Sequence, residues 1–370
     1  MKKLNVALIG YGRSGDMIHG EYLRSDEAKN LFNVVAVVDF DEARRTRAAN
    51  DFGCDTYADY KELFERSDID FVVASTFSNL RYPVVTDLLN HKFNVIAEKP
   101  FSKYAMECEK MIAAAKNNGV MLTVFQQSRV APYYKRVKEI MDSGVLGNIH
   151  SVTISFSNFA RRWDWQCVKR MYGGELLNTA PHPMDQALDI LGFDEMPNVF
   201  SVLKHINNSG DAEDFVKVIL TRPGKPVVEV VVNHCDAYSD FTYSVCGDKG
   251  SLRATTLDAK WKYFDDKPIP ALTTETLRGP DGVGPAYCHE ELEWHEFSES
   301  FAGDALDVGV KNYYENVYRH LTEGEQLHIK PEEVLLQNNA YPALAAVEGL
   351  IFTGPTGTNV NDVAVVLVDG

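Results

Sequence analysis

Five short apolar runs recur through the first 125 residues of this 370-residue chain: "NVALIG", "NVVAVVD", "DFVVAS", "FNVIAE" and "VMLTVF". Continuous apolar runs of this length, rich in β-branched residues, are typical of strands buried on both faces of a parallel sheet. Segments with helical spacing separate the runs, and one of them stops at Gly53, a natural end for a helix. Strands that alternate with helices predict an α/β domain with a doubly wound parallel sheet over residues 1–125.

From about residue 148 the strands become longer, and their apolar residues alternate with polar ones, as in "HSVTISFSNF" and "FVKVILTRPG". Such alternation is typical of an antiparallel sheet with one face turned away from the core. We predict a second, α+β domain over residues 126–370 with a mostly antiparallel sheet. It should carry one inserted helix over 174–192 and a late helix that begins at Pro331. The stretch 256–300 is rich in loop residues and gives no clear element.

Composition removes several classes of function. The net charge of −16 argues against binding to nucleic acid, because an acidic protein repels phosphate backbones. No apolar run approaches the ~18 residues of a membrane helix, so no membrane partner is expected. Six scattered cysteines without a CxxC pair favour reduced thiols in a cytoplasmic protein, and ten dispersed histidines predict no metal site.

A glycine-rich turn follows the first apolar run. "GYGRSG" places Gly10, Gly12 and Gly15 in G-x-G-x-x-G spacing between a predicted strand and a predicted helix. Glycines let a pyrophosphate approach backbone N–H groups at a helix N-terminus, and the intervening Arg13 and Ser14 belong to the same predicted site. The spacing predicts a dinucleotide cofactor.

Asp39 ends the second apolar run and predicts which dinucleotide binds. A carboxylate there accepts hydrogen bonds from ribose hydroxyls and repels a 2′-phosphate, which favours NAD, with NADP as the alternative. Arg44 and Arg45 are interpreted as a solvated helix face, and Asp41 as a helix N-cap. Further cofactor contacts are expected from Thr76 and Asn79 in "STFSNLRY".

The tripeptide "EKP" (Glu98, Lys99 and Pro100) ends the fourth apolar run. Together with "GYGRSG", Asp39 and a later Gly-Gly…His motif, it resembles the Gfo/Idh/MocA family of NAD(P)-dependent oxidoreductases over nearly the whole chain, with a looser similarity to the inositol dehydrogenase-like branch. The resemblance implies that Lys99 sits beside the nicotinamide and the substrate, where its ammonium can stabilise alkoxide character. Glu98 would orient Lys99, and the Lys–Pro bond is a candidate cis bond. The alternative is a surface lysine at a strand end.

The motif "YGGELLNTAPHPMDQAL" departs from the family pattern. That pattern is G-G-x-x-x-D-x-x-x-H, but the acid's place is held here by Asn178, four residues before His182. The spacing predicts that both side chains share one helix face. Three explanations stay open: His182 is the acid/base with lower basicity while Asn178 binds a substrate hydroxyl, Asp185 supplies the missing charge, or the usual chemistry is lost.

Further candidates for substrate binding lie outside these motifs. "NFARRWDWQ" contributes Arg161 and Trp163, because aromatic faces and hydrogen-bonding groups suit a sugar or cyclitol ring; an interface segment is the alternative. Arg129, after the fifth run, is a candidate ligand. Arg81 stands where the family often has histidine, and would bind an acidic substrate or cap a helix. Phe77 stands where the family often has proline.

The sequence as a whole predicts an NAD-dependent enzyme that moves a hydride between nicotinamide and a secondary alcohol or ketone of a sugar, sugar derivative or cyclitol. One alternative is an NAD-dependent glycosidase that oxidises, eliminates and reduces with no net redox change. The other is a nucleotide-sensing regulator without enzymatic activity, against which the intact "EKP" argues. The resemblance also implies a homodimer or homotetramer, with the open face of the second sheet covered by another subunit.

Overall fold

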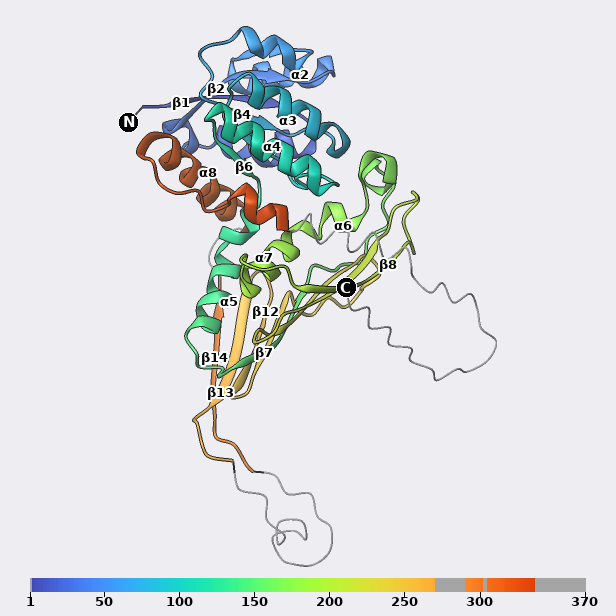
Figure 1. The fold of residues 1–370 in the computed structure, drawn as a ribbon, viewed down its shortest axis with the longest axis vertical. Helices are drawn as coiled ribbons and strands as arrows, with labels where there is room; N and C mark the ends of the chain where they lie inside the picture. Colours follow the sequence, from blue (N-terminus) through green and yellow to red (C-terminus); the bar gives the residue numbers. More distant parts are fainter. Residues whose placement is uncertain (1, 270–289, 302–304, 337–370) are drawn as a thin grey trace, which may run out of the picture.

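The computed structural model describes residues 2–269, 290–301 and 305–336, which build two sheets arranged along the long axis of the molecule (Figure 1). The first sheet has six parallel strands in the order β3-β2-β1-β4-β5-β6. Its strands are β1 (Leu4–Ile9), β2 (Phe32–Val38), β3 (Asp55–Tyr57), β4 (Phe71–Ala74), β5 (Val95–Ala97) and β6 (Leu122–Val124). The prediction of a doubly wound parallel sheet is confirmed.

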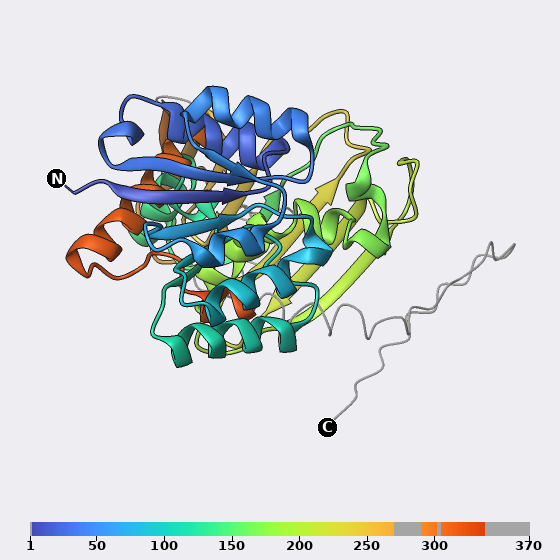
Figure 2. The same ribbon diagram turned by 90° about the horizontal axis from the view of Figure 1, so that it is seen from above.

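The strand order of the first sheet reverses between β1 and β4. Because crossovers between parallel strands are right-handed, the reversal puts α2 (Glu42–Phe52) on one face and α3 (Arg81–Asn90) with α4 (Ala105–Asn118) on the other, as Figure 2 shows. The helix α2 begins where the Asp41 carboxylate accepts the N–H groups of Ala43 and Arg44, and it ends at Gly53 with φ of 64°. Both predicted ends of α2 are therefore confirmed.

The second sheet has eight strands in the order β14-β13-β12-β11-β7-β10-β9-β8. All neighbouring pairs are antiparallel except β7 and β10, so the prediction of a mostly antiparallel sheet is confirmed. The strands are β7 (Ile149–Ser155), β8 (Asn198–Lys204), β9 (Phe215–Thr221), β10 (Val227–Asn233), β11 (Tyr243–Gly247), β12 (Gly250–Ala254), β13 (Asp258–Phe264) and β14 (Trp294–Ser300). Strands β13 and β14 correct the loop-rich interpretation at the two ends of 256–300, where aromatic and polar residues pair across the strands; residues 270–289 lie outside the described residues.

One face of the second sheet packs against α5 (Pro132–Asp142) and α7 (Pro181–Leu191) through a shared apolar cluster. Along β9 and β10 every second residue is buried in this cluster, and the residues between them are half-buried or exposed. Phe200 on β8 is 57% exposed. That another subunit covers the outward face stays a prediction.

The helix α8 (Ala305–Glu323) was not predicted, and it changes how the chain is divided. Its residues Val310, Tyr314 and Val317 are buried in the apolar cluster of the first sheet, where Tyr314 stacks on Tyr22. Residues that follow the second sheet in sequence thus return to the first one, so a single boundary after residue 125 does not describe the packing. Residues 331–336 are helical as predicted, and the rest of the predicted late helix lies outside the described residues.

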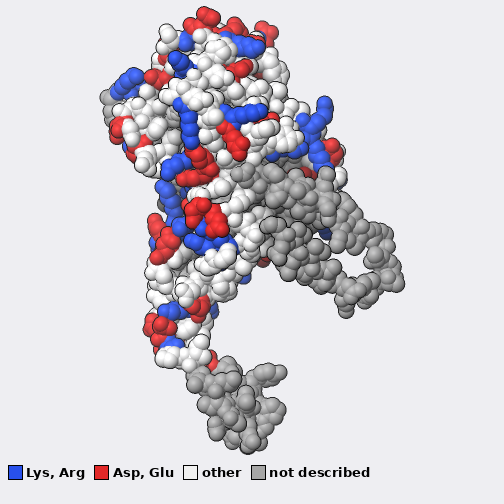
Figure 3. Space-filling view, in the orientation of Figure 1, with Lys and Arg blue, Asp and Glu red and all other residues white. Residues whose placement is uncertain are grey.

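On the face shown in Figure 3, basic and acidic side chains intermingle on both parts of the molecule. A search of the described residues finds no helix that is long and apolar enough to cross a bilayer.

Candidate active site

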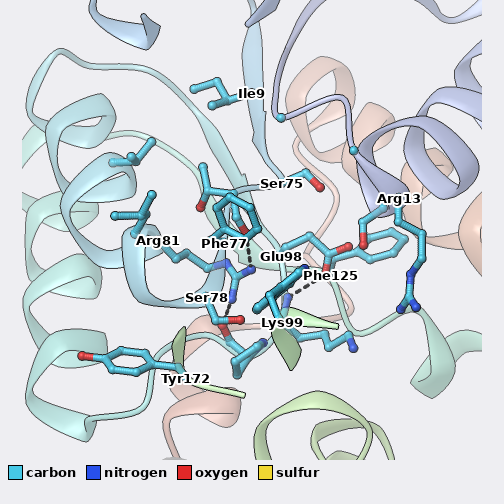
Figure 4. A pocket seen from close by; sticks show the side chains of 18 of the residues that line it. Ile9, Arg13, Ser75, Phe77, Ser78, Arg81, Glu98, Lys99, Phe125 and Tyr172 are labelled. Carbon is cyan, nitrogen blue, oxygen red and sulfur yellow. Dashed lines mark hydrogen bonds between the residues drawn. The ribbon is translucent and has the colours of Figure 1, made fainter. Parts of the chain in front are cut away.

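A cavity of about 870 Å³ lies at the carboxyl ends of the first-sheet strands, where the loops after β1, β2, β4 and β5 meet segments of the second part of the chain. Ligands of doubly wound sheets bind at this edge. Ten residues predicted as site residues line the cavity: Gly10, Gly12, Arg13, Ser14, Asp39, Thr76, Glu98, Lys99, Asn178 and His182. In Figure 4, Glu98 and Lys99 lie between Arg81 on one side and Arg13 on the other.

The glycine turn after β1 leaves no room for larger side chains. A Cβ on Gly10, which has φ of 86°, would lie 2.3 Å from the Ser75 carbonyl oxygen. A Cβ on Gly15 would lie 1.8 Å from the Gly10 carbonyl oxygen, so Gly15 packs behind the turn and does not line the cavity. The close approach of backbone to cavity at Gly10 and Gly12 fits the pyrophosphate of a dinucleotide.

Asp39 is only 4% exposed, and the backbone holds its carboxylate in place. One oxygen accepts the Tyr11 N–H at 2.7 Å and the other accepts the Asp41 N–H at 2.9 Å. Arg44 lines the same cavity with a guanidinium nitrogen 3.6 Å from Asp39 Oδ2, and Arg45 donates to the Asp39 and Phe40 carbonyls. The interpretation of both arginines as a solvated helix face is therefore wrong.

Two buried oxygen atoms at the cavity wall, Thr76 Oγ1 and Gln127 Oε1, have no hydrogen-bond partner within the described part of the chain. A buried polar atom without a partner is costly unless a ligand or water completes it. Asn79 Oδ1 is also unpartnered, but Asn79 does not line the cavity. Gln127 was missed in the sequence, although its place just after the fifth apolar run is the signal that would have found it.

Glu98 is a buried acid at the end of β5. Its Oε1 is 3.2 Å from His19 Nε2, and His19 Nδ1 is 2.8 Å from the Tyr314 hydroxyl on α8. Burial by itself would raise the pKa of Glu98, but the hydrogen bond from His19 and the nearby positive charges lower it to about 2. Glu98 is therefore a carboxylate at neutral pH.

Lys99 joins the two halves of the site. Its backbone N–H donates to Glu98 Oε2 at 2.8 Å, and its Nζ donates to the Asn178 carbonyl oxygen at 2.6 Å. Burial lowers the pKa of Lys99, while the charges of Glu98 and Glu175 oppose that shift. The bond between Lys99 and Pro100 is cis, as predicted.

His182 lies opposite, at the start of α7. Its Nδ1 is 3.0 Å from Gln126 Oε1 and 3.2 Å from Ser128 Oγ. Gln126 Nε2 donates to the Pro181 carbonyl, which leaves the amide oxygen toward the ring, so Nδ1 carries the proton and Nε2 keeps its lone pair. Burial, together with the positive charge of Lys99, lowers the pKa of His182 to about 3. The imidazole is neutral at neutral pH.

Asn178 and His182 do not share a helix, contrary to the prediction. The short helix α6 (Glu175–Asn178) ends at Asn178, and α7 begins at Pro181 after a break. The Asn178 amide is engaged by the protein: Oδ1 accepts from Gln166 Nε2 at 2.7 Å, and Nδ2 lies 3.2 Å from each Glu175 carboxylate oxygen.

The comparisons with known proteins agree with this geometry. Residues 4–126 match the model of an oxidoreductase family with an NAD-binding Rossmann fold, and residues 134–253 match the Gfo/Idh/MocA C-terminal domain. This chain belongs to the Gfo/Idh/MocA family. It is an oxidoreductase, and its first sheet is an NAD-binding Rossmann domain. A model described as the MOFRL family also matches residues 317–362, most of which lie outside the described residues.

Two curated relatives in the family act on inositols by name. Myo-inositol 2-dehydrogenase of Thermotoga maritima is 29% identical over 68% of this chain and 75% of its own length. The scyllo-inositol 2-dehydrogenase (NADP(+)) IolW of Bacillus subtilis is 23% identical over 89% of both chains. Among solved structures, GenD2 from gentamicin A biosynthesis in complex with NAD superposes with a TM-score of 0.75 at 21% identity, covering 95% of this chain and 96% of GenD2. At that identity the likeness shows the fold alone.

Three predicted substrate ligands lie away from the cavity of this Gfo/Idh/MocA member. Arg129 is buried between Asp185, with Nε 2.6 Å from Oδ2, and Glu333 at 2.5 Å. Arg161 and Trp163 are exposed, Trp163 by 83%, and neither lines the cavity; their neighbours Asp164, Trp165 and Gln166 line it instead. Asp185, to which one explanation assigned the charge beside His182, forms an ion pair with Arg129.

Arg81 lines the cavity near Glu98. Its guanidinium donates to the carbonyl oxygens of Pro100 and of Thr76, the latter at 3.0 Å. It therefore ties the loop after β4 to the loop after β5 at the start of α3, and that it binds an acidic substrate stays a prediction.

We expect Arg129→Met to lower the free energy of unfolding by about 3–5 kcal/mol, because it removes the guanidinium from the fully buried Asp185 and the partly buried Glu333. Chemical denaturation measures the change. Arg161→Met, an exposed arginine, should stay within about 0.5 kcal/mol. A stable Arg129→Met protein that loses only substrate affinity would restore the ligand role.

Proposed function

We propose that this oxidoreductase transfers a hydride between nicotinamide and a secondary alcohol or ketone carbon of a neutral sugar derivative or cyclitol. The observation that supports it is the meeting of Lys99 and His182 at one cavity with the glycine turn and Asp39. A cation that donates hydrogen bonds and a neutral imidazole beside a nicotinamide site are what carbinol oxidation or its reverse requires.

The residues divide the work. Bound NAD supplies the hydride acceptor, held by the turn at Gly10 and Gly12 and by Asp39. The Lys99 ammonium donates to the substrate oxygen and stabilises the negative charge that develops there. His182, with its lone pair on Nε2, takes the hydroxyl proton during oxidation and returns it during reduction. Glu98 keeps a fixed negative charge beside Lys99.

The charges around the cavity favour a neutral substrate. Arg162 pairs with Asp164 at 2.8 Å and with Glu175 at 3.2 Å, and Arg81 donates to backbone carbonyls. In the described part of the chain, Arg129 is likewise paired away from the cavity. The rings of Trp165 and Tyr172 line the wall and offer apolar faces to a polyhydroxylated ring.

A panel of substrates tests this proposal. The purified protein is mixed with NAD and with myo-inositol, scyllo-inositol, hexoses, hexosamines or uronic acids, and NADH formation is followed by absorbance. We expect kcat/KM for at least one neutral compound to exceed that for every uronic acid. Turnover of uronic acids alone would contradict the proposal, and release of nitrophenol from nitrophenyl glycosides without net NADH would identify the redox-neutral glycosidase.

The choice between NAD and NADP is a second part of the proposal. Asp39→Ser removes the carboxylate that would repel a 2′-phosphate, and it frees Arg44 from its ion pair. We expect the ratio of kcat/KM for NAD over NADP to fall roughly tenfold or more, about 1.4 kcal/mol. Fluorescence titration with NADH and NADPH measures the change in cofactor affinity without a substrate. An unchanged ratio would mean that Asp39 does not set the preference.

A further inference from the structure

Glu175 is a buried carboxylate that does not line the cavity but contacts Asn178, which in turn binds Lys99. Glu175, the first residue of α6, is 3% exposed. Its Oε1 accepts from Arg162 at 3.2 Å and lies 3.6 Å from His234 Nδ1. Both Glu175 oxygens also lie 3.2 Å from Asn178 Nδ2. A carboxylate at this depth is stable only where such donors surround it.

The side-chain amide of Asn178 places its donor against the Glu175 carboxylate and its acceptor against Gln166. An amide offers donors on Nδ2 and an acceptor on Oδ1; the donors face Glu175, and the acceptor faces Gln166 Nε2 at 2.7 Å. Gln166 is held in turn by the Arg162 guanidinium through its Oε1. The orientation of the Asn178 amide is therefore fixed from both ends.

The hydrogen bonds around Glu175 extend to Lys99 through the backbone carbonyl of Asn178. The Asn178 carbonyl oxygen accepts the hydrogen bond from Lys99 Nζ at 2.6 Å. Whatever fixes Asn178 therefore fixes the point that anchors the Lys99 ammonium. Burial lowers the pKa of Lys99, and the negative charge of Glu175 raises it again in part.

We infer that Glu175 is a positioning residue that supplies a second buried carboxylate at this site besides Glu98, and that residue 178 must be an amide because Glu175 already occupies its donor side. An aspartate at 178 would present only acceptors to Glu175 at about the same separation as the present 3.2 Å contact. Two carboxylates that close cannot both be ionised. Asn178 thus donates to the acid of this site, which is Glu175 one helical turn earlier.

A mutant cycle with a pH series tests this inference. Asn178→Asp should lower Tm by of the order of 5 °C at pH 8. Since one carboxyl of the pair then has a raised pKa in the folded state, protonation relieves the repulsion, and the Tm difference from wild type should shrink as pH falls toward 5. Among the described residues, the charged and titratable side chains near Glu175 include Arg162, His234, Glu213 and Lys99, and they are the same in both proteins.

Rescue separates a specific pairing from a general loss of packing. In Glu175→Gln/Asn178→Asp the donor and acceptor are exchanged across the same contact, so most of the lost Tm should return. Glu213→Gln/Asn178→Asp is the matched control: Glu213 is a half-buried acid beside α6, but it accepts the Leu176 N–H and makes no hydrogen bond with Asn178 among the described residues. This control should recover little of the Tm that Asn178→Asp loses.

The inference fails if Asn178→Asp is as stable as wild type from pH 5 to pH 8, or if Gln at 175 recovers no more than Gln at 213. These stability readings need no substrate, so they stand apart from the test of the proposed function. The effect on turnover does rest on that function. With a substrate from the panel, Glu175→Gln should move the alkaline limb of kcat/KM to lower pH, because the Lys99 ammonium loses a stabilising charge.

Discussion

Lys99→Ala should lower kcat roughly 10³-fold, because it removes the only donor that our proposal assigns to the developing alkoxide. The loss should appear in kcat rather than in NADH affinity, since the glycine turn and Asp39 keep their geometry. Steady-state kinetics with a substrate from the panel measures the first quantity, and fluorescence titration with NADH measures the second. Lys99→Arg should recover only part of the rate, because a planar guanidinium replaces a compact ammonium.

Lys103→Ala is the matched control for that experiment. Lys103 follows the same loop after β5, but its Nζ lies over the rings of Tyr104 and Tyr172, at 5.6 and 5.5 Å, and it does not line the cavity. Its removal should change kcat by no more than about twofold. A folded Lys99→Ala protein with wild-type turnover would remove the central residue of the proposed mechanism.

His182→Ala should lower kcat by roughly 10²–10⁴-fold through the loss of proton transfer to and from the substrate oxygen. His91→Ala is the control. His91 is exposed, stacks on Phe64 and does not line the cavity, so the rate should stay near that of wild type. If both histidine variants turn over substrate at the wild-type rate, the proton carrier is another group.

The pH dependence gives an independent test of His182. Its pKa is lowered to about 3 in the folded protein, so the imidazole is neutral throughout the neutral range and is a weaker base than an ordinary histidine. The acid limb of kcat/KM should therefore lie well below the ordinary histidine pKa of ~6.5. Burial of a neutral histidine also stabilises the fold above pH ~6.5, and this contribution is lost as pH falls toward 3. His182→Ala should accordingly lose less stability than wild type on acidification.

Part of the site could be predicted because its residues obey local rules. The turn at Gly10 and the cap at Asp41 follow from steric limits and from hydrogen bonds within a few residues. Asp39 and Lys99 could be placed because each follows an apolar run, and the ends of parallel strands meet at one edge of a sheet.

Other residues were misjudged because their partners are far away in the chain. Arg129 resembled a ligand until Glu333 and Asp185 were found against it, 204 and 56 positions away. Arg44 is an exception, because its partner Asp39 is close in sequence and the first turn of α2 brings the two side chains together. A charged side chain gives the same sequence signal whether it pairs with a protein group or with a substrate.

Short-range patterns were enough to predict the parallel sheet, the glycine turn, both ends of α2 and the positions of Lys99 and His182, because hydrophobic periodicity and backbone sterics act over short stretches. The folded structure added the return of α8 to the first sheet, the break between α6 and α7, and the contact between Glu175 and Asn178. The packing of α8 depends on contacts between segments distant in sequence, and so does the pairing of the buried Glu175 carboxylate with Arg162 and His234. The contact between Glu175 and Asn178 is local, but the charge pattern of the sequence does not show which buried charge meets which donor.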